Sequence, residues 1–180
     1  MTTPHPASPA ARSELVLGVL GGSGLYAIEG LEDVQTVSLD TPFGAASGPF
    51  TTGRLARPGG LPPIRVVFVP RHGPGHVLLP GEINYRANLH GLKQLGVTHI
   101  VAVSAVGSLQ EAIAPGHVVV PDQLIDRTRG RQSTFFGGGV VGHVQFGDPY
   151  CPRMRARIAS AALAEGATVH EGGALVVMEG

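Results

Sequence analysis

The chain of 180 residues carries 13 basic and 13 acidic side chains, so its formal net charge is zero. This length is enough to bury a conventional core, and a hydrophobic content of 43% excludes an intrinsically disordered chain. The balanced charge argues against a nucleic-acid footprint or a polybasic membrane patch, and no apolar run approaches the roughly 18 residues that a membrane-spanning helix needs. We therefore expect a soluble protein, without a nucleic-acid or membrane partner, whose chemistry comes from a local site.

The single cysteine and the N-terminal segment indicate the compartment. Cys151 excludes an internal disulfide and a cysteine-rich zinc site, so a cytoplasmic location is expected, and a buried structural thiol is the expected role. Residues 1–13 contain three prolines and no apolar segment of their own, which predicts a disordered tail rather than a secretory signal. Residues 14–180 are expected to form the folded part.

The first half of the chain predicts four strands and one helix. Short apolar or alternating runs are bounded by glycine and proline turns, as in a hairpin or meander. The predicted strands span residues 15–20, 34–39, 50–55 and 64–70. Helical spacing of apolar residues follows over residues 84–95, and Gly96 is placed to end that helix.

The second half predicts further buried strands and a second helix. Strand patterns cover residues 98–104, 118–121 and 174–178, and a helix is predicted over residues 153–165. Near-continuous apolar strands separated by helices are typical of a sheet that is covered on both faces. The predicted fold class is α/β, with a mixed, largely parallel central sheet flanked by helices.

Three loops with small or basic residues come directly after predicted strands. They contain residues 21–24, the pair Arg71 and His72, and the pair Ser104 and Ala105. Ligands of open α/β sheets bind beyond the carboxyl ends of the strands, so these loops can converge on one crevice.

The chemistry of the three loops suits an oxyanion. Glycine lets backbone N–H groups approach a ligand closely, and Ser23 and Ser104 add hydroxyl donors. Arg71 offers a planar fork that matches two phosphate oxygens, and His72 can donate a further hydrogen bond. Taken alone, Gly-Gly-Ser-Gly is more typical of an ordinary turn and the Arg-His pair of a solvated loop. Their placement after equivalent strands favours one shared anion site.

Several ordered motifs together resemble one known family, the methylthioadenosine phosphorylases, which are nucleoside phosphorylases. The resemblance covers roughly residues 15–180. The motifs that carry it are residues 21–25 (GGSGL), 40–44 (DTPFG), 71–73 (RHG) with His76, 84–88 (NYRAN), 104–109 (SAVGSL), 122–128 (DQLIDRT) and 148–152 (DPYCP).

The resemblance implies a phosphorolysis reaction. Inorganic phosphate would attack the anomeric carbon of 5′-methylthioadenosine, releasing adenine and 5-methylthioribose 1-phosphate. By family position, the phosphate ligands would be Ser23, Arg71, His72, Ser104 and the backbone of Ala105. No metal and no cofactor are implied, because phosphate is itself a co-substrate.

Two further histidines gain a role from the resemblance. His143 aligns with a residue that, in the family's trimers, reaches into the neighbour's pocket and closes it over the 5′ substituent of the sugar, so a homotrimer is implied. Without the resemblance, its glycine-rich surroundings indicate a solvated loop residue. His76 would line the sugar side of the pocket or orient the Arg71 loop. The remaining histidines are expected to be structural or on the surface: His5, His90, His99, His117 and His170.

The chain departs from the family pattern in two ways. Serine stands at positions 23 and 104, where members with an adenine-type substrate often carry threonine; the hydroxyl is retained. The residues that recognise the base lie beyond Gly180, including the acid that protonates the purine. Residues 14–180 are therefore expected to be the N-terminal two thirds of a single domain, truncated at the C-terminus, with the catalytic acid unknown.

Other interpretations remain open at this stage. A 6-oxopurine phosphorylase acting on inosine, guanosine or methylthioinosine would share the same phosphate loops. A truncated relative would retain a phosphate pocket without activity, because general acid catalysis contributes about 10²- to 10⁴-fold. A dinucleotide-binding oxidoreductase domain is disfavoured, because the glycine turn lacks the Gly-x-Gly-x-x-Gly spacing.

Overall fold

The computed structural model describes residues 14–21 and 29–178, and the chain divides between Ser104 and Ala105 into two compact units. The expected disordered tail, residues 1–13, lies outside the described residues, as does the glycine turn from Gly22 onward. Among the described helices, none is long and apolar enough to cross a membrane.

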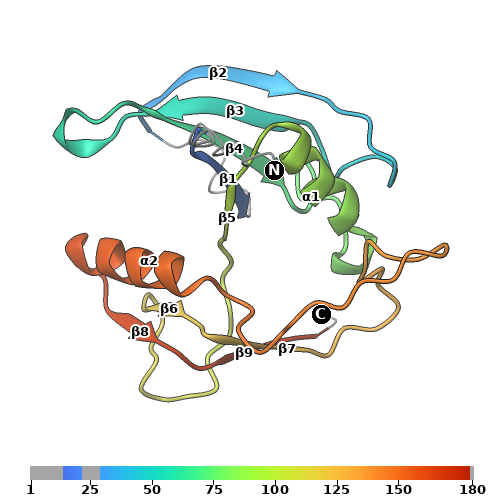
Figure 1. The fold of residues 1–180 in the computed structure, drawn as a ribbon. Helices are drawn as coiled ribbons and strands as arrows, with labels where there is room; N and C mark the ends of the chain where they lie inside the picture. Colours follow the sequence, from blue (N-terminus) through green and yellow to red (C-terminus); the bar gives the residue numbers. More distant parts are fainter. Residues whose placement is uncertain (1–13, 22–28, 179–180) are drawn as a thin grey trace, which may run out of the picture. The chain divides into compact units, whose positions relative to one another are not determined.

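The first unit is built on a five-stranded mixed sheet with the strand order β2-β3-β4-β1-β5 (Figure 1). Strand β1 lies parallel to both β4 and β5, whereas β3 is antiparallel to β2 and β4. The strands span Val16–Gly21 (β1), Leu31–Val37 (β2), Phe50–Leu55 (β3), Ile64–Pro70 (β4) and His99–Ala102 (β5). Two short 3-10 turns accompany them, Pro58–Gly60 and Pro80–Glu82.

Strand β4 is buried on both faces because it is almost continuously apolar. Val67 and Val69 pack into one core cluster, and Val66 and Phe68 pack into the other. Successive side chains of a strand point to opposite faces, so one short apolar run supplies both cores. Strand β5 lies at the edge of the sheet and is mostly exposed, and it is shorter than the predicted strand over residues 98–104.

Helix α1, Tyr85–Gln94, covers one face of the sheet. It begins where the Oδ1 atom of Asn84 accepts the Ala87 N–H at 3.1 Å, and Gly96, with a φ of +80°, follows its last turn. Leu92 is fully buried against the ring of Phe50 and its neighbours. The predicted helix over residues 84–95 is thus confirmed.

The second unit combines one helix with two parallel strand pairs. Helix α2 spans Pro152–Ala164 and packs against β6 and β8. Strand β6, Val118–Val120, pairs with β8, Val169–Glu171. Strand β7, Gln123–Asp126, pairs with β9, Ala174–Val177. The predicted strands at residues 118 and 174 and the predicted helix are confirmed, whereas β7 and β8 were not predicted.

The expectation that Cys151 is a buried structural thiol is wrong, since its side chain is exposed. Cys151 occupies the N-cap position of α2, where the backbone is still extended and the side chain makes no capping hydrogen bond. In helix α2 itself only Ala159 is buried. Cysteine is usually a buried residue, but Cys151 lies at the solvent-exposed start of a helix. The composition of the chain does not reveal that location.

Candidate functional site

The carboxyl ends of three neighbouring parallel strands meet at one edge of the first unit's sheet. Gly21 of β1 is opposite Pro70 of β4, and Leu20 of β1 is opposite Ala102 of β5. The Val103 N–H continues the last ladder by donating to the Leu20 carbonyl at 2.8 Å. Neighbouring strands are about 4.8 Å apart, so the segments that follow these strands start side by side.

Arg71 is the first residue after β4 and is half-buried. Its Nε atom is inaccessible to solvent and has no hydrogen-bond partner among the described residues. A buried donor without a partner costs about 1–3 kcal/mol, and more when the group is charged. Because guanidinium stays ionised in proteins, an anion at this sheet edge is the kind of group that would satisfy Arg71.

The turn after β4 is held by its own backbone. The Gly73 N–H donates to the Pro70 carbonyl at 2.9 Å, and the Leu78 N–H donates to the His72 carbonyl at 3.0 Å. Gly73 is buried with a φ of +74°, and a Cβ atom there would lie 3.0 Å from the Ser47 carbonyl oxygen. Only glycine fits this position without strain, so the Arg71–His72 turn has a defined conformation.

His72 and His76 lie against each other within this turn. Their rings stack with centroids 4.3 Å apart and an angle of 16° between the ring planes. His72 also bonds through Nδ1 to the Leu78 carbonyl oxygen at 2.9 Å. His76 has a φ of +60°, which is uncommon for a residue with a side chain. The structure therefore brings the predicted residues Arg71, His72 and His76 together on one short turn.

The buried Asn88 supports this turn indirectly, and it was not predicted as a site residue. Asn88 of α1 is fully buried; its Oδ1 accepts the Ser47 N–H at 2.8 Å, and its Nδ2 donates to the Ser47 hydroxyl at 2.9 Å. The segment held in this way packs against the turn, because a Cβ atom at Gly48 would lie 2.8 Å from Pro74 and 2.9 Å from Pro70. The signal that could have identified Asn88 is an amide on the apolar face of a predicted helix.

The other predicted site residues are not part of this turn. Ser104 is exposed shortly after β5, at the same sheet edge. Ser23 lies outside the described residues. Ala105 begins the second unit, and His143 lies in an exposed loop of that unit. The roles assigned to all of these residues stay predictions.

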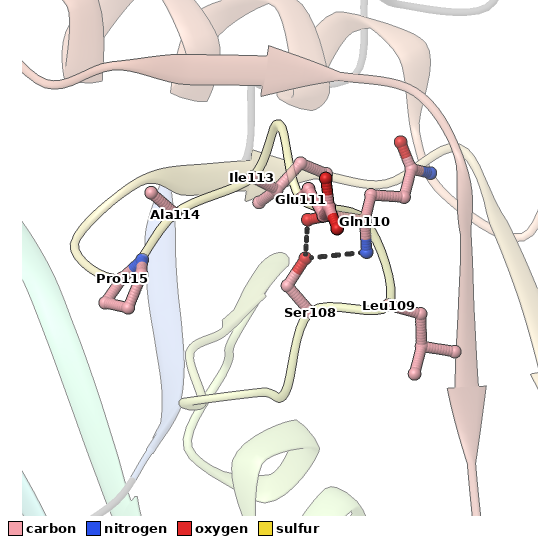
Figure 2. A pocket seen from close by; sticks show the side chains of 7 residues that line it. All are labelled: Ser108, Leu109, Gln110, Glu111, Ile113, Ala114 and Pro115. Atoms are coloured by element: carbon pink, nitrogen blue, oxygen red, sulfur yellow. Dashed lines mark hydrogen bonds between the residues drawn. The ribbon is translucent and has the colours of Figure 1, made fainter.

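The second unit contains an open hollow of about 560 Å³ (Figure 2). None of its lining residues belongs to the predicted site, and the Ser108 hydroxyl is already engaged with the backbone of Gln110, at 2.7 Å to the carbonyl and 3.1 Å to the N–H. The hollow is lined by Ser108, Leu109, Gln110, Glu111, Ile113, Ala114 and Pro115.

Two ionisable groups of the second unit are shifted by their surroundings. Hydrogen bonds from Thr128 lower the pKa of Asp126, and burial raises the pKa of Tyr150. Neither belongs to the predicted site. Within the described ranges, no three histidine, cysteine or carboxylate side chains gather closely enough to hold a metal ion.

The sequence and the fold are similar to those of known phosphorylases. The chain is 57% identical over 168 residues to the S-methyl-5′-thioadenosine phosphorylase of Geobacter sulfurreducens, which covers 93% of this chain and 57% of that protein. It is 54% identical to the enzyme of the same name from Synechocystis sp., with 91% of this chain and 49% of that protein covered.

Solved structures agree with the sequence relatives. A methylthioadenosine phosphorylase from an antarctic soil metagenomic library superimposes with a TM-score of 0.85 at 42% identity, covering 94% of this chain and 58% of that chain. The apo methylthioadenosine phosphorylase from Schistosoma mansoni gives a TM-score of 0.81 at 34% identity, covering 93% of this chain and 65% of that one. The predicted α/β fold of the nucleoside phosphorylase type is therefore confirmed.

The chain spans about half to two thirds of the length of these relatives. Residues 16–180 match the family described as the phosphorylase superfamily, which is nearly the whole chain. The predicted family is confirmed, and the chain belongs to the phosphorylase superfamily.

Proposed function

We propose that the protein containing this chain catalyses the phosphorolysis of 5′-methylthioadenosine. Inorganic phosphate would displace adenine from the anomeric carbon and leave 5-methylthioribose 1-phosphate. The observation that carries the proposal is the Arg71–His72 turn beside the ends of β1 and β5, where the buried Nε of Arg71 finds no hydrogen-bond partner within the described part of the chain.

The proposed site places cationic and hydroxyl donors where an attacking anion is needed. Arg71 would hold two phosphate oxygens, while Ser23, Ser104, His72 and the Ala105 backbone would donate the remaining hydrogen bonds. Cleavage of a glycosidic bond passes through an oxocarbenium-like state. A phosphate held against the anomeric carbon would stabilise that positive charge and supply the nucleophile, so the reaction needs no metal or cofactor.

The choice of substrate rests on the relatives. The proteins and structures that are similar over more than nine tenths of this chain carry the name methylthioadenosine phosphorylase. This favours the methylthio substrate over inosine or guanosine. The proposal does not assign an acid to the purine leaving group.

A homotrimer in the cytoplasm completes the proposal. His143 would reach from one subunit toward the sugar side of the neighbour's pocket, and its exposure leaves it available for such a contact. Val141 and Val144 beside it are also exposed, at 80% and 74%, as is common for apolar residues that meet a partner. Sedimentation of the purified protein at several concentrations tests the assembly.

The activity is tested by incubating the 180-residue chain, and any longer polypeptide that its gene encodes, with 5′-methylthioadenosine. Each is assayed with and without phosphate, and inosine serves as the comparison substrate. We expect adenine to be released only when phosphate is present, and faster than any hypoxanthine from inosine. No adenine release at saturating phosphate by either polypeptide would contradict the proposal.

The site assignment is tested separately with two arginine variants. Arg71→Ala should weaken phosphate binding roughly ten- to hundredfold, because hydrogen bonds to charged groups contribute about 1.5–3 kcal/mol. Arg54→Ala is the matched control, because the Arg54 side chain is 52% exposed. Its ion pair, from Nε to Oδ2 of the exposed Asp33, is long at 3.9 Å. Equal phosphate affinities in the two variants would show that the pocket is assigned to the wrong loop.

A further inference from the structure

One hydrogen bond of His72 constrains how its side chain can meet an anion. The Nδ1 atom lies 2.9 Å from the Leu78 carbonyl oxygen. A carbonyl oxygen only accepts hydrogen bonds, so Nδ1 must carry a proton. The Leu78 N–H donates back to the His72 carbonyl at 3.0 Å, so this pair of residues is joined by two hydrogen bonds and the ring orientation is fixed.

Fixing the proton on Nδ1 decides the state of Nε2. A neutral imidazole has only one N–H, so Nε2 of neutral His72 presents a lone pair. The oxygens of a fully ionised anion also present only lone pairs. Neutral His72 therefore has no hydrogen bond to offer such an anion, whereas the imidazolium form donates from both nitrogens.

We infer that an anion bound at the Arg71–His72 turn is held through one proton placed between Nε2 of His72 and an anion oxygen. This inference rests on the proposed phosphate site. Above neutral pH, phosphate is mainly the dianion HPO4²⁻, whose own P–OH can donate to the Nε2 lone pair of neutral His72. Phosphate therefore brings this proton with it, and no bond within the phosphate breaks. Sulfate brings no proton of its own, so the imidazole must take one up from solution.

None of the described charged groups near His72 is placed to take up this proton, so the His72 ring takes it up. Arg71 precedes it and keeps its charge at all relevant pH values. Glu82 uses Oε2 to accept the Leu79 N–H at 2.8 Å. The segment 44–49, which packs against Gly73, contains no titratable side chain.

His76 is the alternative carrier, because its ring stacks on His72 at 4.3 Å. Two imidazolium charges at this separation repel each other. The geometry assigns that proton to His72, since the Leu78 carbonyl is the acceptor that orients its ring.

Sulfate and phosphate titrations of the full chain at constant ionic strength, from pH 6 to 9, test the inference by calorimetry. We expect the sulfate Kd of the unmodified protein to rise with pH, by at most about tenfold per pH unit, because each bound sulfate takes up one proton. Repeating the titration in two buffers of different ionisation heat should show the uptake of one proton per sulfate. Thermal melts check that each variant is folded.

Two variants locate the proton. His72→Gln offers an amide N–H that needs no protonation, so its sulfate affinity should not depend on pH. His76→Gln should keep the dependence of the unmodified protein. Loss of the dependence in His76→Gln alone would overturn the assignment to His72.

The remaining outcomes separate this inference from the proposed function. If sulfate binds with the same affinity from pH 6 to 9 and takes up no proton, the linkage is wrong while the phosphate site stands. If neither anion binds at any pH, the phosphate site itself is refuted, and the linkage falls with it.

Discussion

The Nδ1 atom of His117 lies 2.9 Å from the Nε2 atom of His170, and the two rings are stacked with centroids 5.0 Å apart. The Ala114 N–H also donates to Nδ1 of His117, at 3.2 Å. That nitrogen is therefore an acceptor, and His170 is the donor of the pair. His117 precedes β6 and His170 lies within β8, so the contact ties the loop before β6 to the strand that β6 pairs with.

Replacing either histidine by alanine should destabilise the fold by about 1 kcal/mol, the usual net contribution of one hydrogen bond. Because the residues touch, the double variant should lose less than the sum of the single losses, with a coupling of about 0.5–1 kcal/mol. Urea unfolding of the four proteins measures this. His99→Ala is the control, since its bond to the Thr98 hydroxyl is exposed. Strictly additive losses would show that the rings do not interact.

Gly91 should be needed in α1 although glycine is a poor helix former. A methyl group there would collide with the ring of Phe50, which is fully buried. Gly91→Ala gains about 1 kcal/mol of helix propensity, but overpacking a filled core costs about 1–3 kcal/mol, so we expect a net loss of stability in thermal unfolding. Gly81→Ala, with nothing within 4 Å in the described structure, should show no loss. A stabilised Gly91→Ala protein would mean that the Phe50 ring moves aside easily.

Local sequence patterns were sufficient where a strand or helix forms from its own residues. The predicted strands over residues 50–55 and 64–70 coincide with β3 and β4, because apolar runs between turns specify a buried strand by themselves. Helix α1 was predictable for a similar reason, since Asn84 and Gly96 mark its two ends.

Patterns failed where structure depends on a distant partner. Strand β8 has only three residues and forms by pairing with β6, about fifty residues earlier, so no local periodicity marks it. The three strand ends could be placed at one sheet edge from the sequence, because parallel strands end together. The bond from Asn88 to Ser47 spans 41 residues, and the stack of His72 on His76 depends on the turn's left-handed residues. Only coordinates give those contacts.

Asn88 should support both the fold and the phosphate turn. Asn88→Ala removes two hydrogen bonds and leaves Ser47 unsatisfied against the core, so unfolding should become easier by about 1–3 kcal/mol. The segment at Ser47 packs against Gly73, and loosening it should also weaken phosphate binding. Ser47→Ala keeps the bond from the backbone N–H and should show a smaller loss in both measurements. Unchanged phosphate affinity in Asn88→Ala would show that the hydrogen bonds of Asn88 stabilise the core without supporting the phosphate site.

Thr128 should lower the pKa of Asp126 through its hydrogen bonds. The Thr128 side chain and its N–H, which lies 2.8 Å from Oδ1, lower the pKa of Asp126 below the ordinary 3.8, with a smaller contribution from Arg131. Thr128→Val removes only the hydroxyl bond, so an NMR titration of the Asp126 carboxyl should move up toward 3.8. Thr128→Ser keeps the hydroxyl and should titrate like the unmodified protein.

Because folding lowers the pKa of Asp126, the stability of the protein should depend on pH, and the direction of the pKa shift gives the sign of that dependence. A carboxyl whose pKa is lowered by folding stabilises the protein at pH values above its ordinary, unfolded-state pKa of 3.8. This contribution disappears as pH falls through the folded pKa. Asp126 is exposed, so solvent screening keeps the effect small. Thr128→Val should therefore be slightly less stable than the unmodified protein above pH ~4, and the two should converge in more acidic solution. A difference that persists unchanged at low pH would arise from lost packing rather than from the carboxylate.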